Sequence, residues 1–213
     1  MAKILFMKYD FRKMKLLYLA SIVLFAPLGY VMAYSTENIL SAYSYMLLIS
    51  TIVPTSLFTY EQRADCGFDL MLPAKEGDRI AGRYLISAVT IIYEFLLGTV
   101  IAFILTKTTQ AVWFDISVIF KFFVGGILIC MSIELCILYI IGRGINPQVR
   151  SVMIMLPNMI IWGIAYAAIN IFSDKLSSAK GIFSNFEMLG NIVLIVSLIF
   201  YIASMYVSRR KIG

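Results

Sequence analysis

The chain has 213 residues, of which 61% are hydrophobic and only 14% charged, and its formal net charge is +6. An average soluble domain is about half apolar and roughly a quarter charged. A soluble protein of this size could not bury so much apolar surface, so the excess faces lipid and predicts an all-α membrane protein. The basic residues stand beside apolar runs, which indicates membrane lipid as a partner and no nucleic acid.

The sequence contains no histidine. Histidine-based acid–base catalysis and histidine metal sites are therefore excluded. The chain also lacks the G-x-x-x-x-G-K-[ST] loop that cradles nucleotide phosphates. We expect no catalytic, cofactor-binding or metal-binding residues in this chain, and no enzyme activity of its own.

The N-terminal stretch 1–15 interleaves apolar residues such as Phe6, Phe11 and Met14 with five basic residues. This mixture predicts a short amphipathic helix that lies in the membrane interface before the first span. A disordered basic flank is the alternative.

Six apolar stretches have the length of roughly 20 residues that a bilayer-spanning helix needs. They are residues 16–34, 41–60, 84–106, 118–142, 151–172 and 186–208. The first has no small-residue cleavage site, so we expect it to be retained. Fourteen of the 18 Lys and Arg residues flank the side that carries both chain ends, which predicts that both ends are cytoplasmic. We expect one transmembrane domain over residues 1–213, with Pro27 kinking the first span.

Two carboxylates lie inside predicted spans, Glu94 and Glu134. A charge at that depth costs about 2.5–3.5 kcal/mol on insertion scales, so each is expected to face the bundle interior or water. They could form an intramembrane polar site for a cationic substrate, or each could be a structural tie to a nearby hydroxyl. Lys121, near the outer end of the fourth span, is explained by snorkelling. Gly125 lacks a small-xxx-small partner and receives little weight.

The loop 61–83 between the second and third spans contains an apolar patch far from any span. Phe68, Leu70, Met71 and Leu72 form it, and Pro73 then breaks the chain before a charged helical re-entry into the third span. The patch can lie on the membrane surface or insert into a partner.

This loop resembles the permease subunits of type 2 ABC transporters, the small six-helix exporter class. The matching residues are Glu61, Phe68, Leu72-Pro73, Lys75, Asp78-Arg79-Ile80 and Arg83-Tyr84. The six-helix layout and the basic lead-in helix agree over the whole chain. The departure is Asp65-Cys66-Gly67, where many relatives have a tryptophan-containing stretch.

The resemblance implies that 61–83 is a cytoplasmic coupling loop, docked on an ABC ATP-binding subunit that binds ATP and Mg²⁺. The implied contact residues are Phe68, Leu70, Met71, Leu72, Pro73 and Arg79. It also implies a second permease copy or a related subunit, location in the bacterial cytoplasmic membrane, and export of a peptide, drug-like or lipid-like substrate.

A six-helix substrate-binding membrane subunit of a vitamin-uptake transporter is the alternative function. Those proteins have similar length but do not usually carry the Leu-Pro coupling loop. A membrane enzyme fits poorly, because rhomboid-type proteolysis needs a histidine and the loop aspartates Asp65, Asp69 and Asp78 are unsuitably spaced for a metal.

Overall fold

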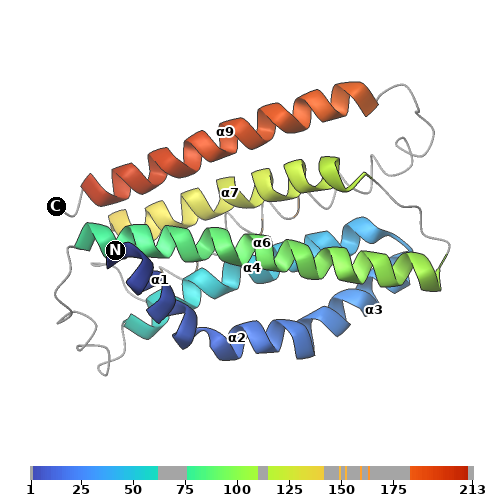
Figure 1. Ribbon diagram of the computed structural model, residues 1–213, viewed down its shortest axis with the longest axis horizontal. Helices are drawn as coiled ribbons and strands as arrows, with labels where there is room; N and C mark the ends of the chain where they lie inside the picture. The colour runs from blue at the N-terminus through green and yellow to red at the C-terminus, as the bar shows by residue number, and fades with distance from the viewer. Residues whose placement is uncertain are drawn as a thin grey trace.

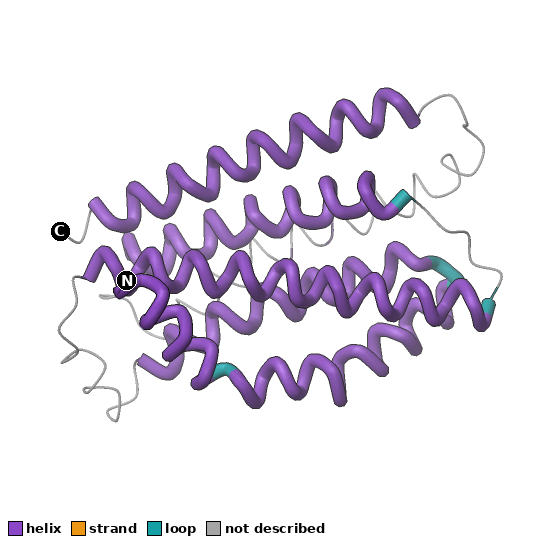
Figure 2. The backbone as a smooth tube through the Cα atoms, viewed as in Figure 1, coloured by secondary structure: helices purple, strands orange, loops and turns teal. Residues whose placement is uncertain are grey.

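The computed structural model describes residues 2–61, 76–109, 115–141 and 183–210, with four separate helical positions at 149, 152, 159 and 163. Every regular element in these residues is helical (Figures 1 and 2). The helices form an elongated bundle in which the first helix begins and the last helix ends at the same end (Figure 1). We call this the terminal end, and the opposite one the far end.

The chain begins with four short helices in succession: α1 (Ala2–Lys13), α2 (Lys15–Ala20), the π-helix η1 (Ser21–Phe25) and α3 (Ala26–Thr36). The last three form the first membrane segment, Lys15–Thr36. In η1 the N–H of Ala26 donates to the carbonyl oxygen of Ser21, five residues back. Pro27 explains this wider turn, since it has no N–H and its ring would collide with the carbonyl of Val23 in a regular α-helix. The predicted irregularity at Pro27 is therefore present as a π-helical turn.

A tight turn reverses the chain between α3 and α4 (Ile39–Glu61). Glu37 has a φ of 49°, and the side-chain oxygen of Asn38 accepts a 2.9 Å hydrogen bond from a backbone N–H in the first turn of α4. The two helices then pack closely, because a Cβ on Gly29 would lie 3.0 Å from the ring of Tyr45. This places α3 and α4 side by side.

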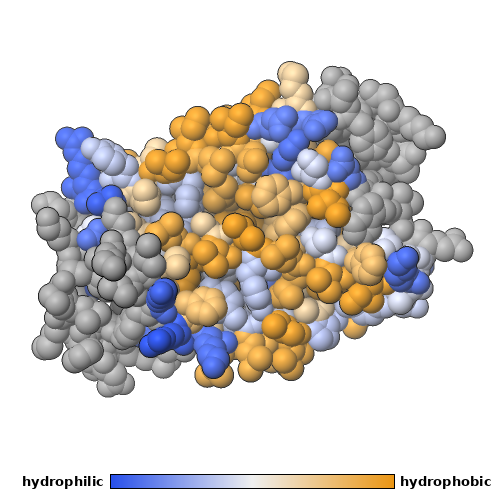
Figure 3. All heavy atoms as spheres, viewed as in Figure 1, coloured by the Kyte–Doolittle hydropathy of each residue, from blue (hydrophilic) through white to orange (hydrophobic). Residues whose placement is uncertain are grey.

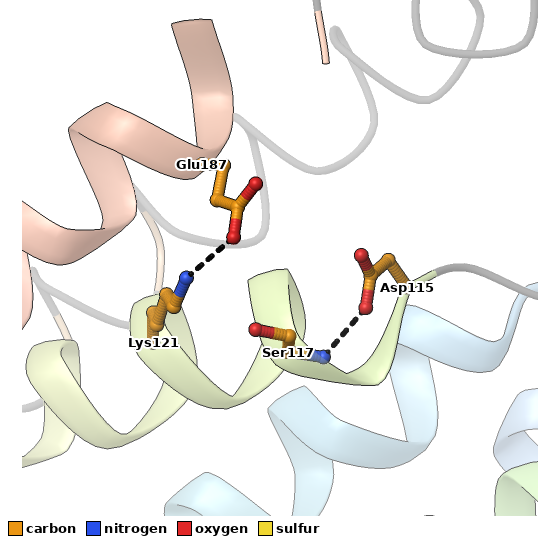
Figure 4. Close-up of polar contacts among 4 residues, drawn as sticks. All are labelled: Asp115, Ser117, Lys121 and Glu187. Atoms are coloured by element: carbon orange, nitrogen blue, oxygen red, sulfur yellow. Dashed lines mark hydrogen bonds and ion pairs between the residues drawn. The ribbon is translucent and has the colours of Figure 1, made fainter. Parts of the chain in front are cut away.

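Three long helices complete the described bundle: α6 (Glu76–Thr108), α7 (Ile116–Ile141) and α9 (Phe183–Arg210). The charged stretch before the third predicted span is helical, as expected, because α6 already begins at Glu76. Asp115 caps α7 by accepting a 2.8 Å hydrogen bond from the N–H of Ser117 (Figure 4). Arg209 and Arg210 end α9, where positive charge is favourable at a helix C-terminus.

Helices α7 and α9 form the most extensive contact between two elements of the described bundle. A Cβ on Gly125 of α7 would lie 2.9 Å from Val193 of α9, and a Cβ on Gly190 would lie 3.2 Å from the Cβ of Lys121. Small residues recur every seven positions on α9, at 190, 197 and 204, which is the spacing of a coiled-coil-like helix pair. Gly125 therefore matters more than its sequence context predicts.

Four helical stretches are long and apolar enough to cross a membrane: Lys15–Thr36, Gly77–Thr108, Ile116–Ile140 and Glu187–Arg210. They correspond to the first, third, fourth and sixth predicted spans. The second prediction matches α4, in which Ile39–Ile52 is apolar but shorter than a full span. The fifth, 151–172, lies outside the described residues except for three positions. The all-helical prediction is confirmed; the count of six and the cytoplasmic termini stay predictions.

The surface matches a bilayer environment. Apolar side chains cover the middle of the face in Figure 3, and hydrophilic ones gather toward both ends. Burial is graded across the bundle: the most apolar window of α7 is 67% buried inside the protein, whereas those of the first segment and α9 are each 22% buried. Exposed apolar residues on α6 recur about one turn apart, at Leu85, Val89, Ile92, Leu96, Val100 and Phe103. We infer that this stripe faces lipid.

Candidate functional site

The predicted coupling loop is bracketed by described helices. Its apolar contact residues, Phe68, Leu70, Met71, Leu72 and Pro73, lie outside the described residues. Helix α4 ends at Glu61 and α6 begins at Glu76, both at the terminal end of the bundle (Figure 1). The last predicted contact residue, Arg79, lies in the first turns of α6 and is buried within the chain.

A line of polar side chains runs along one face of α6 inside the protein. Arg83, Ser87, Thr90 and Glu94 recur at intervals of three or four residues, and each is at most 3% exposed. This spacing places all four on the same helical face. Three of them, Arg83, Thr90 and Glu94, contact the N-terminal segment, by which we mean α1, α2 and η1.

Polar side chains of the N-terminal segment contact this line at three points, which we call polar steps and take in order from the terminal end inward. Asp10 pairs with Arg83 at 3.7 Å. The hydroxyls of Tyr18 and Thr90 lie 2.6 Å apart in a hydrogen bond. The hydroxyl of Ser21 donates a 2.8 Å hydrogen bond to Oε1 of Glu94.

Apolar packing fills the spaces between these polar steps. Met14, Tyr18 and Ile86 form a small buried cluster, with Met7, Leu17 and Tyr93 packed around it. The hydroxyl of Tyr93 also donates to the carbonyl oxygen of Tyr18 at 2.9 Å. The N-terminal segment is therefore packed against the first half of α6 through alternating polar and apolar contacts.

Glu94 is fully buried at the innermost of the three steps. Its Oε1 accepts from Ser21, and its Oε2 accepts no hydrogen bond from any described residue. A bare carboxylate in such a site is costly. The π-helical turn at Ser21 brings the first membrane segment against this carboxyl group, so one of its two oxygens has a hydrogen-bond donor.

Glu134 lies on α7 and is 3% exposed. It stands one turn after Cys130, which is also buried. Glu94 accepts its hydrogen bond from Ser21 of the N-terminal segment. A shared polar site between Glu94 and Glu134 stays a prediction.

A second buried polar cluster, which we call the hydroxyl cluster, joins α6, α7 and α9. The hydroxyl of Tyr84 lies 2.7 Å from that of Ser204 and 3.1 Å from that of Ser208. Ser204 in turn donates to the carbonyl oxygen of Ser132 at 2.7 Å, and the hydroxyl of Tyr201 donates to the carbonyl oxygen of Tyr84 at 2.6 Å. Each hydroxyl named here has a partner, which suits a cluster that fixes helix positions.

Comparison with known proteins decides the family. The sequence model of one family, described as ABC-2 family transporter protein, matches residues 5–212 and so nearly the whole chain. The chain belongs to this family. No curated protein and no solved structure matches it.

As a member of the ABC-2 transporter family, the protein is a multi-pass membrane subunit with a transport role, and this family typically works with an ATP-binding subunit. The earlier resemblance to type 2 ABC permeases is confirmed by the match. The family assignment covers the chain as a whole, whereas the roles of Arg79, Glu94 and Glu134 within it stay predictions.

Several residues of this ABC-2 transporter protein were not singled out from the sequence although a signal was present. Thr90 and Ser87 stand at helical spacing between Arg83 and Glu94, in an otherwise apolar span. That spacing marks a polar face. The partners of Arg83, Thr90 and Glu94 are spaced less regularly, by eight and three residues, because the N-terminal helix changes form at Met14 and again at Ser21; these partners are Asp10, Tyr18 and Ser21.

Lys121 shows a different environment from the one expected. Its ammonium group lies 3.2 Å from Oε1 of Glu187, so it bridges α7 to α9 at the far end (Figure 4). The Lys121 side chain is 14% exposed and that of Glu187 is 60% exposed. Snorkelling alone does not explain Lys121, because its ammonium group forms an ion pair with a carboxylate 66 positions away in the sequence.

Proposed function

We propose that this chain is the membrane-spanning subunit of an ATP-driven exporter. A separate ABC ATP-binding subunit binds ATP and Mg²⁺ and docks on the loop 61–83 at the cytoplasmic side. Two such permeases, or this one with a related subunit, surround the path of a peptide, drug-like or lipid-like substrate in the bacterial cytoplasmic membrane. The family match supports the permease assignment.

The observation that carries the coupling proposal is the continuity of α6. This helix begins at Glu76, immediately after the loop, and continues without interruption for 33 residues to Thr108. At 1.5 Å per residue it is about 50 Å long, more than the thickness of the hydrocarbon core of a bilayer. A displacement of the loop by the ATP-binding subunit would tilt or shift this rigid helix, and so reach the far end of the bundle.

The placement of charge supports a cytoplasmic terminal end. Described basic residues gather there on three helices, among them Arg12 on α1, Arg83 on α6 and Arg210 on α9. By contrast, the basic residues described near the far end are Lys107 and Lys121. An excess of Lys and Arg marks the cytoplasmic side, and a loop there can meet an ATPase.

Co-purification tests the coupling proposal. The chain is co-expressed with a candidate ABC ATP-binding subunit from the same genome, and the variant Phe68→Asp/Leu72→Asp is compared with the conservative control Phe68→Leu/Leu72→Met. We expect the wild type and the control to retain the ATPase and the aspartate variant to lose it, because a charged side chain cannot enter an apolar groove without a large desolvation cost. Equal retention by all three proteins would contradict the proposal.

The direction of transport and the charge of the substrate need a separate test. Glu94 and Glu134 would favour a cationic group on the substrate if either lines the path. Efflux of cationic and neutral substrates is measured with Glu94→Gln and Glu134→Gln at matched expression. A selective loss of cationic transport would assign the carboxylate to the path; unchanged rates in both variants would leave them as structural ties.

A further inference from the structure

One face of the N-terminal segment is exposed and carries only basic and apolar side chains. It crosses the junction between α1 and α2, with members spaced three or four residues apart, or side by side. They are Lys8, Phe11, Arg12, Lys15, Leu16 and Leu19, and we call them the basic face. This spacing places them on one side of a helix.

The opposite side of the same segment is turned into the protein. Asp10, Met14 and Tyr18 are buried there against α6. Asp10 is the only acidic residue among residues 1–20, and its charge is compensated by Arg83 at 3.7 Å. The basic face therefore carries no acidic side chain, because the one carboxylate of residues 1–20 is buried on the opposite side.

The cations of the basic face have no protein counter-ion in the part of the chain that the structure describes. Lys8, Arg12 and Lys15 take part in no ion pair with a described residue. Like charges one turn apart on a helix repel one another by a few tenths of a kcal/mol. An anion outside the chain would remove this repulsion.

The apolar members of the face define where that anion lies. Leu16 is 79% exposed and Leu19 is 56% exposed, and both belong to the stretch Lys15–Thr36 that is apolar enough to cross the membrane. Within three helical turns the surface thus changes from cations to large aliphatic side chains. The boundary between phospholipid headgroups and acyl chains has this same order of charge and apolarity.

From these observations we propose that the basic face binds the headgroups of anionic phospholipids, with Lys8, Arg12 and Lys15 on the phosphates and Leu16 and Leu19 among the acyl chains. The proposal does not depend on the exporter function. Because Asp10 joins α1 to Arg83, bound lipid also holds the start of α6 in place. The N-terminal segment is then an anchor for α6, the helix that follows the loop 61–83.

A local lipid probe tests this directly. The two native tryptophans are replaced by Trp113→Phe and Trp162→Phe, and a reporter is introduced by Leu16→Trp in the full chain. The protein is reconstituted in phosphatidylcholine vesicles that contain a minor fraction of phosphatidylglycerol. Quenching by brominated phosphatidylglycerol is compared with quenching by brominated phosphatidylcholine, which gives the enrichment of the anionic lipid beside the reporter.

We expect phosphatidylglycerol to be enriched severalfold at the Leu16→Trp reporter. Each of Lys8→Gln, Arg12→Gln and Lys15→Gln should lower the enrichment, and the triple glutamine variant should bring it to the bulk composition. The charge-conserving variant Lys8→Arg/Lys15→Arg should keep the enrichment of the wild-type basic face. Raising the salt to about 1 M should abolish it in the otherwise unchanged chain, because the Debye length falls to about 3 Å.

The matched control removes two basic residues from another helix at the same end. Arg209→Gln/Arg210→Gln should leave the enrichment at the Leu16→Trp reporter unchanged, and a Val207→Trp reporter should not respond to the α1 substitutions. If the fraction of phosphatidylglycerol beside the Leu16→Trp reporter equals that of the whole vesicle, the proposal is overturned. An enrichment that survives the triple glutamine variant or high salt would also overturn it. The salt experiment needs no variant of α1, so it decides the matter even if the triple variant fails to fold.

Discussion

The hydroxyl of Ser21 donates a 2.8 Å hydrogen bond to Oε1 of Glu94, across 73 positions of sequence. Ser21 opens the π-helical turn that precedes Pro27, and Glu94 lies buried in the middle of α6. An irregular turn in the first membrane segment and an intramembrane carboxylate therefore meet at one point. Because π-helical turns are often found at functional sites, this contact is a suitable place to perturb the bundle.

A double-mutant cycle on this pair should show coupling. Ser21→Ala and Glu94→Gln are made singly and together, and unfolding is followed in mixed micelles as the fraction of SDS rises. We expect a coupling energy of about 1 kcal/mol, since interhelical hydrogen bonds in membranes average roughly 0.6 kcal/mol and bonds to charged groups are stronger. Ser35→Ala, on the exposed side of α3, is the control and should change stability by less. Strictly additive effects would mean that the contact does not stabilise the fold.

Removing the negative charge of Asp10 should be more costly. Asp10→Asn removes the carboxylate that lies 3.7 Å from the guanidinium of Arg83, which is 3% exposed. Breaking a buried ion pair from one side costs about 3–5 kcal/mol. Asp78→Asn is the matched control, because Asp78 lies in the first turn of α6 and is only half-buried. The same unfolding assay should show a small effect for Asp78→Asn; equal effects of the two variants would contradict the buried pair.

The general architecture was accessible from the sequence because it depends on local patterns. Runs of about 20 apolar residues predict spans wherever they occur, and four of them coincide with long described helices. Mixed basic and apolar residues before Leu16 predict the lead-in helix α1 in the same way. These signals need no knowledge of which helix packs against which.

The contacts of the candidate site needed the fold itself. Glu94 was recognisable as a buried carboxylate, but its partner Ser21 could not be chosen among the many serines of the chain. The same holds for Lys121, whose partner Glu187 depends on the pairing of α7 with α9. Hydropathy reports depth in the membrane, whereas these contacts depend on the rotation of each helix about its own axis.

Adjacent glycines on α7 should respond in opposite ways to the same substitution. A Cβ on Gly125 would lie 2.9 Å from Val193, whose branched side chain has few rotamers, whereas a Cβ on Gly126 would meet nothing within 4 Å. Gly125→Ala should therefore destabilise the protein by about 1–3 kcal/mol through overpacking. Gly126→Ala should be neutral or stabilising, since alanine favours helix by up to about 1 kcal/mol.

Unfolding in mixed micelles measures both variants, and Gly125→Ser adds a graded case. Since both substitutions add the same atom to the same helix one residue apart, a general effect of losing glycine would appear in both. A destabilisation shared equally by Gly125→Ala and Gly126→Ala would contradict the close approach of α7 and α9.

Alanine substitution at two serines of α9 should destabilise the protein to different extents. Ser204 lies between the hydroxyl of Tyr84 and the carbonyl oxygen of Ser132, at 2.7 Å from each, and so connects three helices. Among the residues that the structure describes, the hydroxyl of Ser208 bonds only to Tyr84, at 3.1 Å. Ser204→Ala should cost about 1–2 kcal/mol, because it removes two hydrogen bonds and leaves Tyr84 with the weaker of its two partners.

Ser208→Ala should cost less than about 1 kcal/mol, because Tyr84 keeps its shorter bond to Ser204. The combined variant removes both hydroxyl partners of Tyr84, and its cost should exceed the sum of the single effects. Restoring the loss by Tyr84→Phe in the combined background would locate the penalty at the buried phenol, since that substitution removes the group left without a partner. If Tyr84→Phe lowers stability further in that background, the phenol has another partner and the cluster does not depend on these serines.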